Sequence, residues 1–196
     1  MSLLDSLFNK AKKSVADAVK NAAKNASETK KKCIFSSLPQ NAEELKLLPG
    51  ADLNDPYWTA AFTVAALCRY PEDRDACVEM LNYLKGPRPL TPLEISFIKD
   101  RFMDGVDYVP RSYFLGTSPQ NDYTPAQPYT VEIMELAHSR DNFNEGYLKL
   151  FIRSSGADSE RYVVLRHKPS TDQWFLWEFA GMLSGIRQPV SKDAWA

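Results

Sequence analysis

Apolar residues recur every three or four positions along the first 32 residues, which is the period of one face of an α-helix. The largest of them come early, at Leu3, Leu4, Leu7 and Phe8, and alanine and valine continue the pattern. Eight lysines and three acidic residues share this segment, so its net charge is +5. The pattern predicts a basic amphipathic helical arm over residues 1–32.

Proline and glycine interrupt any periodicity over 33–53, which predicts a linker. Three helices are then predicted, at about 57–70, at 72–85 and from Thr91 onward. The first is apolar on nearly all sides, so a central, buried position is expected. The third begins with TPLE, a capping box that has proline at the first helical position. Its expected buried stripe comprises Leu93, Phe97, Ile98 and Phe102.

Periodicity is lost between 104 and 128, where four prolines and two glycines predict a long loop packed on the domain. A period of two then predicts strands at about 129–138, 147–153, 161–168 and 173–179. Short, turn-rich loops between them favour an antiparallel meander. The predicted fold is therefore α+β: an N-terminal amphipathic helix, then about three helices packed on a four-stranded antiparallel meander. Residues 54–196 are expected to form one domain.

Alternation divides the strand residues into two faces. The expected core face contains Leu148, Leu150, Ile152, Val163, Leu165, Phe175, Trp177 and Phe179. The opposite face mixes aromatic and charged residues: Tyr147, Lys149, Phe151, Arg153, Tyr162, Val164, Arg166, Trp174, Leu176 and Glu178.

Three interpretations of this mixed face remain open. The 104–128 loop covers it and its charges pair across strands; or a small ligand or a peptide binds between loop and sheet, with Arg153 and Arg166 holding an anionic group; or single-stranded nucleic acid stacks on its aromatic residues. A net charge of −6 over the remaining 164 residues argues against nucleic acid. The candidate ligand-binding residues are Tyr113, Asn121, Asp122, Tyr123, Arg153, Arg166, Trp174 and Glu178.

The composition is that of an ordinary soluble protein, with 44% hydrophobic and 25% charged residues. Three cysteines without a C-x-x-C pair indicate free thiols in a reducing compartment, and a cytoplasmic location is expected. The spacing of histidines, cysteines and glycines predicts no metal site and no cofactor. The two histidines, His138 and His167, support one alternative to a non-catalytic protein: a small hydrolase or transferase with either residue as general base.

The basic arm admits three roles. At an anionic membrane, Leu3, Leu4, Leu7 and Phe8 insert while Lys12 and Lys13 meet the headgroups, which predicts a peripheral protein at the inner membrane face. A partner helix is the second candidate, because Leu4, Phe8, Ala11 and Val15 follow coiled-coil spacing. A merely solubilising helix is the third.

Three stretches carry a resemblance to known sequences: GTSPQNDYTP at 116–125, SSGADSER at 154–161, and QWFLWEF followed by GIRQPVSKDAWA at 173–196. Together they resemble an uncharacterised bacterial family of Firmicutes type. The resemblance implies a shared fold without any catalytic residues to assign. The sequence as a whole predicts a non-catalytic cytoplasmic binding protein, with an arm for membrane or partner attachment and a recognition surface made by loop and sheet.

Overall fold

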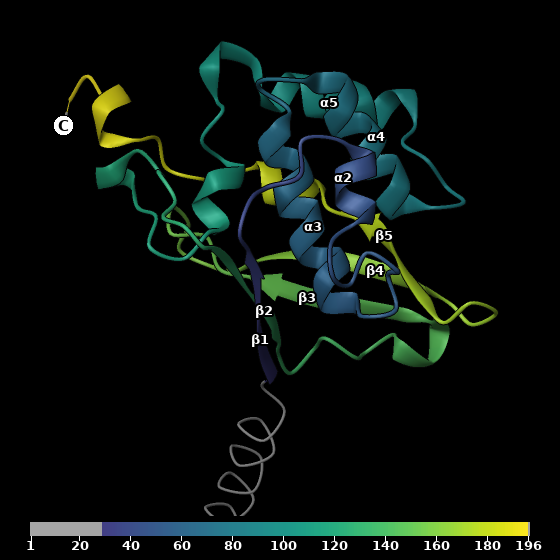
Figure 1. Cartoon of the computed structure of the whole chain (residues 1–196). Helices are drawn as coiled ribbons and strands as arrows, with labels where there is room; N and C mark the ends of the chain where they lie inside the picture. The colour runs from purple at the N-terminus through teal and green to yellow at the C-terminus, as the bar shows by residue number, and fades with distance from the viewer. Residues whose placement is uncertain (1–28, 196) are drawn as a thin grey trace, which may run out of the picture.

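Five antiparallel strands form the sheet of this protein, whose computed structural model describes residues 29–195 (Figure 1). Along the sheet they follow their order in the chain, each antiparallel to its neighbour. The last four are the predicted meander. The strands are β1 (Thr29–Phe35), β2 (Tyr129–Glu135), β3 (Tyr147–Ile152), β4 (Arg161–Lys168) and β5 (Gln173–Glu178).

The fifth strand, β1, corrects the expectation of four. It includes Lys30, Lys31 and Lys32, which the sequence analysis assigned to the end of the helical arm, and it pairs with β2 along its whole length. Its inward positions explain the difference: Cys33 and Phe35 are buried, and Lys31 forms an ion pair with Asp55. The remainder of the predicted arm, with its attachment residues from Leu3 to Lys13, lies outside the described residues.

Within residues 29–195, four helices cover one face of the sheet (Figure 1). Side chains of Asn41, Asp55, Asp73 and Thr91 cap their N-termini, so each helix begins where the local sequence supplies an acceptor. Nine consecutive residues of α3 are buried, and it lies centrally against the sheet. The helices are α2 (Ala42–Lys46), α3 (Pro56–Arg69), α4 (Arg74–Lys85) and α5 (Pro92–Arg101).

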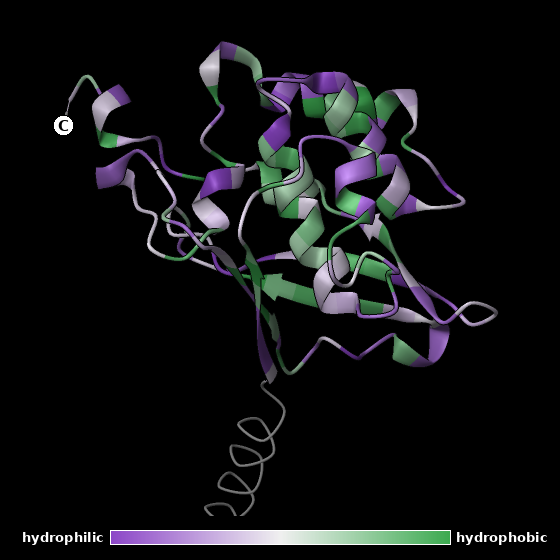
Figure 2. Ribbon diagram, in the orientation of Figure 1, coloured by the Kyte–Doolittle hydropathy of each residue, from purple (hydrophilic) through white to green (hydrophobic). Residues whose placement is uncertain are grey.

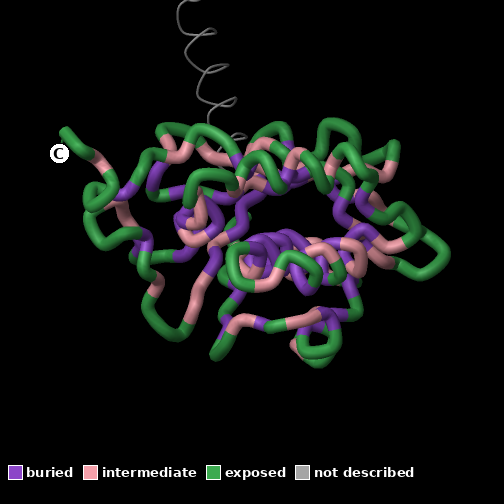
Figure 3. Tube along the Cα trace, turned by 90° about the horizontal axis from the view of Figure 1, so that it is seen from above, coloured by how far each residue is buried: buried purple, intermediate pink, exposed green. Residues whose placement is uncertain are grey.

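The core lies between these helices and the sheet. Apolar residues concentrate along α3 and the middle strands (Figure 2), and buried positions gather in the interior (Figure 3). The segment 33–53, expected as a linker, is packed into this core, because it contributes the end of β1, α2 and the buried side chains of Leu45 and Leu53. The carbonyl of Leu53 also accepts a hydrogen bond of 2.8 Å from the backbone of Trp174 in β5.

The expected core face is confirmed on β3 and β4, where Leu148, Leu150, Ile152, Val163 and Leu165 are buried. On β5 the expectation is wrong for Trp177, whereas Phe175 packs partly buried against the core and Phe179, just beyond the strand, is buried as expected. Trp174 and Leu176 are buried there, whereas Trp177 is 36% exposed on the opposite face. Two causes combine: successive apolar residues in QWFLWEF give no clear alternation, and an irregularity between Val164 and Leu165 shifts the pairing of β4 with β5.

Candidate functional site

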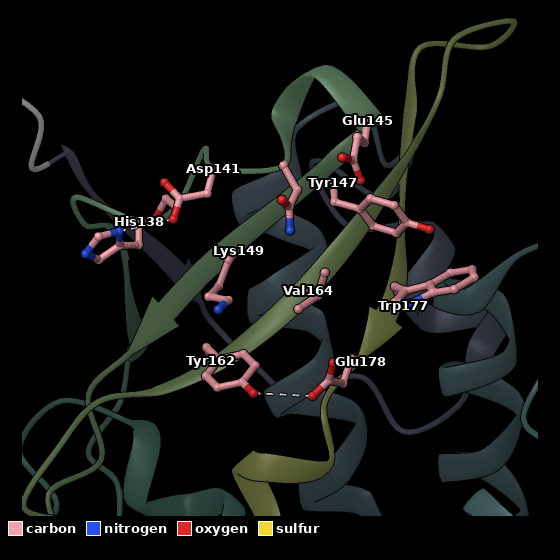
Figure 4. A pocket seen from close by; sticks show the side chains of 11 residues that line it. His138, Asp141, Glu145, Tyr147, Lys149, Tyr162, Val164, Trp177 and Glu178 are labelled. Atoms are coloured by element: carbon pink, nitrogen blue, oxygen red, sulfur yellow. Dashed lines mark hydrogen bonds and ion pairs between the residues drawn. The ribbon is translucent and has the colours of Figure 1, made fainter.

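The sheet face that the helices leave uncovered has a hollow of about 430 Å³ (Figure 4). Outward-facing residues of the last three strands form its floor, because alternate residues of a strand point to the same face. Tyr147 and Trp177 meet edge to face, with 5.5 Å between ring centroids. Beside them, the Tyr162 hydroxyl donates a 3.4 Å hydrogen bond to Glu178 Oε1, and Lys149 Nζ lies 4.7 Å from the centroid of the Tyr162 ring.

The β2–β3 loop forms the rim of this hollow. Its fold is fixed by Ser139, whose hydroxyl accepts a 2.9 Å hydrogen bond from Leu136 N–H and whose carbonyl accepts one of 3.0 Å from Lys149 N–H. This arrangement places three polar side chains on the rim: His138, Asp141 and Glu145. His138 Nδ1 lies 3.1 Å from Asp141 Oδ2, and both side chains are exposed.

Carboxylates outnumber cations in the lining. Asp141, Glu145 and Glu178 face the hollow with Lys149, and neither glutamate has an ion-pair partner among residues 29–195. The negative charge of Glu178 raises the pKa of the Tyr162 hydroxyl, which therefore stays neutral at physiological pH.

Two arginine side chains lie against the faces of aromatic rings that line the hollow. Arg166 lies 4.3 Å from the Tyr147 ring centroid and Arg88 lies 4.2 Å from that of Trp177. With Lys149, these two arginines equal in number the three carboxylates of the lining, but both guanidinium groups lie against ring faces.

The two histidines lie in different surroundings. His167 is on the helix-facing side of β4, where its ring stacks on Trp174 at 4.5 Å and Nε2 lies 2.8 Å from Asp172 Oδ1. Only His138 borders the hollow. The neighbouring Ser139 also lines the hollow, but its side chain is buried and its hydroxyl accepts the hydrogen bond from Leu136 N–H.

The cysteine thiols and the potential metal ligands of the described residues do not favour thiol or metal chemistry. Burial raises the pKa of Cys33 and of Cys68 to about 12, and it raises the pKa of Cys77 as well, so these thiols stay protonated at neutral pH. Residues 29–195 contain no group of three histidine, cysteine or acidic side chains able to hold a metal ion. No helix within the same range is long and apolar enough to cross a membrane.

The structure does not bring the eight predicted ligand-binding residues together. Tyr113 and Tyr123 are buried, and their hydroxyls donate hydrogen bonds of 2.6 and 2.8 Å to the carbonyls of Met182 and Arg187. The 104–128 loop thus fastens the C-terminal segment, and none of its residues lines the outer hollow. Trp174 is buried on the helix side.

The other predicted residues divide between several places. Glu178 lines the outer hollow and Arg166 lies behind one of its rings. Arg153 borders a second hollow, of about 150 Å³, together with Tyr113. Asn121 closes a capping box with Ser118, and Asp122 accepts a 2.6 Å hydrogen bond from Ser191.

Sequence reasoning missed Asp141, Glu145 and Trp177 as residues of this site. The alternation of apolar residues predicts Trp177 in the core, and the sequence predicts only a turn-rich loop around the two acidic residues. The signal that was present is the RDNFNEG composition of that loop, which is too rich in charge and amide groups for a buried connection.

A further hollow, of about 330 Å³, lies between α5 and the end of β5. Leu93 and Phe97 of α5 line it, as do Trp177, Glu178 and Phe179. The predicted buried stripe of α5 is only partly buried: Ile98 is fully enclosed, but Leu93 is 79% exposed. This helix is the outermost of the layer, so its N-terminal turn projects beyond the core.

A family model described as "Domain of unknown function (DUF6935)" matches residues 37–190. The chain belongs to this family. The DUF6935 match covers all four helices, strands β2 to β5 and the residues that line the three hollows, so the predicted membership in an uncharacterised family is confirmed. Searches of curated proteins and of solved structures found no match.

Proposed function

We propose that this DUF6935 protein is a non-catalytic cytoplasmic binding protein that recognises a basic peptide on the outer face of its sheet. The observation that carries the proposal is the outer hollow. It is open, it has aromatic walls, and its lining contains three carboxylates and one lysine. Polar groups make up most of this lining, and Tyr147 and Trp177 add flat aromatic surfaces against which the side chains of a peptide can pack.

The geometry suits a peptide that carries lysine or arginine. Trp177 and Tyr147 offer large, rigid contact areas, and such residues dominate the binding energy of many interfaces. The carboxylates of Glu145 and Glu178 stand at the rim and on the floor, where each can accept charge-assisted hydrogen bonds from a cation.

The N-terminal arm supplies attachment in this proposal. Leu3, Leu4, Leu7 and Phe8 would enter an anionic membrane surface while Lys12 and Lys13 meet its headgroups, each basic group contributing about 1 kcal/mol. Lys30 and Lys32 are exposed on β1 directly after this segment, so they extend the basic charge onto the domain. A partner helix is the alternative attachment.

The test is a titration of the full-length protein with pentalysine, followed by tryptophan fluorescence and calorimetry. Wild type should bind pentalysine saturably and should not bind pentaglutamate. The double variant Glu145→Gln/Glu178→Gln should weaken binding at least tenfold. Glu43→Gln, which neutralises an exposed carboxylate on α2, is the matched control and should bind as wild type does. Equal binding by wild type and the double variant would refute the proposal.

A second candidate function is a small hydrolase or transferase with His138 as general base. It is favoured by one observation, the 3.1 Å contact of His138 with Asp141 at the rim of the same hollow, since a carboxylate can orient an imidazole for proton transfer. Hydrolysis of p-nitrophenyl acetate by wild type and by His138→Ala tests it. Equal rates would exclude His138 as the base.

A further inference from the structure

The outer hollow and the hollow beside α5 share one wall, formed by Trp177 and Glu178. The two hollows therefore adjoin at these two residues, and we refer to the pair, from the outer sheet face past β5 to α5, as the groove. Its chemistry changes along its length. The sheet end carries the carboxylates and tyrosines, and the α5 end is lined by Leu93, Phe97 and Phe179.

The apolar end needs an apolar occupant. Leu93 is 79% exposed and Trp177 is 36% exposed, and both border the same hollow. Burying apolar side chains removes their surface from water, so an occupant with large aliphatic or aromatic groups gains most here. The complete groove thus fits an amphipathic segment that places basic residues next to bulky apolar ones.

We propose that the occupant is the N-terminal segment of this same chain, residues 1–28. The inference rests on the proposed function, because it names the basic peptide that the site binds. Leu3, Leu4, Leu7 and Phe8 would fill the α5 end. On the helix that the sequence predicts, Lys10 and Lys12 flank the apolar stripe.

Charge is complementary between segment and groove. Residues 6–16 contain three lysines and no acidic residue. Residues 1–28 contain five lysines and three acidic residues, which gives a net charge of +2. Because the whole chain has a net charge of −1, residues 29–196 carry a net charge of −3. With the apolar residues at α5, the lysines would lie toward Glu145 and Glu178, which line the outer hollow and form no ion pair with residues 29–195.

The segment is long enough to reach the groove within one molecule. It joins the domain at Thr29 in β1, and β5 is the opposite edge strand. Four strand spacings of about 4.8 Å separate these edges, or about 19 Å. The 20 residues between Phe8 and Thr29 span about 30 Å if helical and about 66 Å if extended.

Docking in the groove and insertion into a membrane use the same residues. Leu7 and Phe8 cannot be buried against α5 and in lipid at once. Docking of the arm in the groove and its insertion into an anionic membrane surface therefore exclude each other, and a membrane should compete with the groove for the arm.

The experiment is zero-length carbodiimide cross-linking of the full-length protein, with mass spectrometry of an equal mixture of ¹⁴N- and ¹⁵N-labelled chains. We expect isopeptide bonds from Lys10, Lys12 or Lys13 to Glu145 or Glu178, within single-isotope molecules. Anionic vesicles should reduce their yield at least fivefold, and neutral vesicles should not. The variant Leu7→Asp/Phe8→Asp keeps every lysine and should lose the cross-links.

Unchanged yields in that variant, or cross-links scattered over carboxylates elsewhere on the domain, would overturn the inference. Mixed-isotope cross-links would show docking on a second copy, and they would also overturn docking within one molecule. The pentalysine titration separates the two proposals when it is repeated with the Leu7→Asp/Phe8→Asp variant, in which the arm should not compete with pentalysine for the groove. If pentalysine binds through Glu145 and Glu178 but no such cross-link forms, the proposed function stands and self-docking is wrong; if pentalysine does not bind either, both fail.

Discussion

Replacing Glu94 by glutamine should destabilise the protein by about 3 kcal/mol, because it removes the counter-charge of a buried lysine. Lys85 ends α4 and is only 3% exposed. Its ammonium donates a 2.8 Å hydrogen bond to Glu94 Oε1, while Glu94 Oε2 accepts 2.8 Å bonds from the backbone and the hydroxyl of Thr91. Burial alone would raise the pKa of Glu94, but the bonds from Lys85 and Thr91 outweigh burial and lower it.

The substitution by glutamine removes the charge of Glu94 but keeps the helix cap, because glutamine also serves at the third position of a capping box. Loss of one partner of a buried ion pair costs about 3–5 kcal/mol. The lower end applies here because Glu94 is one-third exposed and glutamine still offers an acceptor to Lys85. With a urea m-value of about 2 kcal/mol/M, the unfolding midpoint should fall by about 1.5 M.

The assay is urea unfolding at pH 7, followed by far-ultraviolet circular dichroism, and it needs two comparisons. Lys85→Met/Glu94→Gln replaces the pair by groups that need no counter-charge and should lie within about 1 kcal/mol of wild type. Glu43→Gln breaks an exposed pair with Lys46 and should cost less than about 0.5 kcal/mol. A loss below about 1 kcal/mol for Glu94→Gln, or a double variant no more stable than Glu94→Gln, would refute the reasoning.

Two further predictions concern backbone and pH. Gly86 has a φ of +57°, and a β-carbon added there would lie 2.3 Å from the ring of Phe175 in β5. Gly116 has a φ of +82°, but a β-carbon there would meet open space. Gly86→Ala should therefore lower the free energy of unfolding by about 2 kcal/mol more than Gly116→Ala does, as measured by thermal or urea unfolding. Burial alone would raise the pKa of Glu135, but hydrogen bonds from Arg140 and Tyr57 outweigh burial and lower this pKa. The ionised Glu135 carboxylate therefore stabilises the folded protein above about pH 4.3, and this stabilisation is lost as the pH falls further. Glu135→Gln should consequently be less stable than wild type at pH 6 and should lose less stability between pH 6 and pH 3; an equal loss would contradict this.

Most of the fold could be predicted because its signals are local. The α5 capping box lies within four consecutive residues, and the alternation in β3 and β4 fixes which face each side chain takes. Strand β1 could not be found in this way. Only Cys33 and Phe35 of its seven residues are buried apolar groups, and three lysines continue the basic composition of the preceding segment. Its strand state depends on pairing with β2, which is about 100 residues away in the sequence.

The candidate site was harder to predict than the fold, because it depends on one strand whose phase the sequence leaves open. Reversing the faces of β5 moves Trp177 from the core to the outer surface and moves Trp174 the other way. Of the residues predicted to bind a ligand, Glu178 lines the hollow, whereas Arg166 packs against the Tyr147 ring. Loop–sheet contact, on which the expected site relied, instead anchors Tyr113 and Tyr123 to the C-terminal segment.

The reversed phase of β5 also explains why the surface has an amphipathic rather than a uniform character. Had Trp177 faced the helices, the outer face would end at β4 and the apolar hollow of α5 would be closed off from it. With Trp177 outward, one indole borders the aromatic–acidic hollow on one side and Leu93 and Phe97 on the other. A peptide that contacts Trp177 therefore meets carboxylates and an apolar surface together. For this reason, a single substitution, Trp177→Ala, should weaken both pentalysine binding and the docking of residues 1–28, whereas Leu93→Ser should affect only the second.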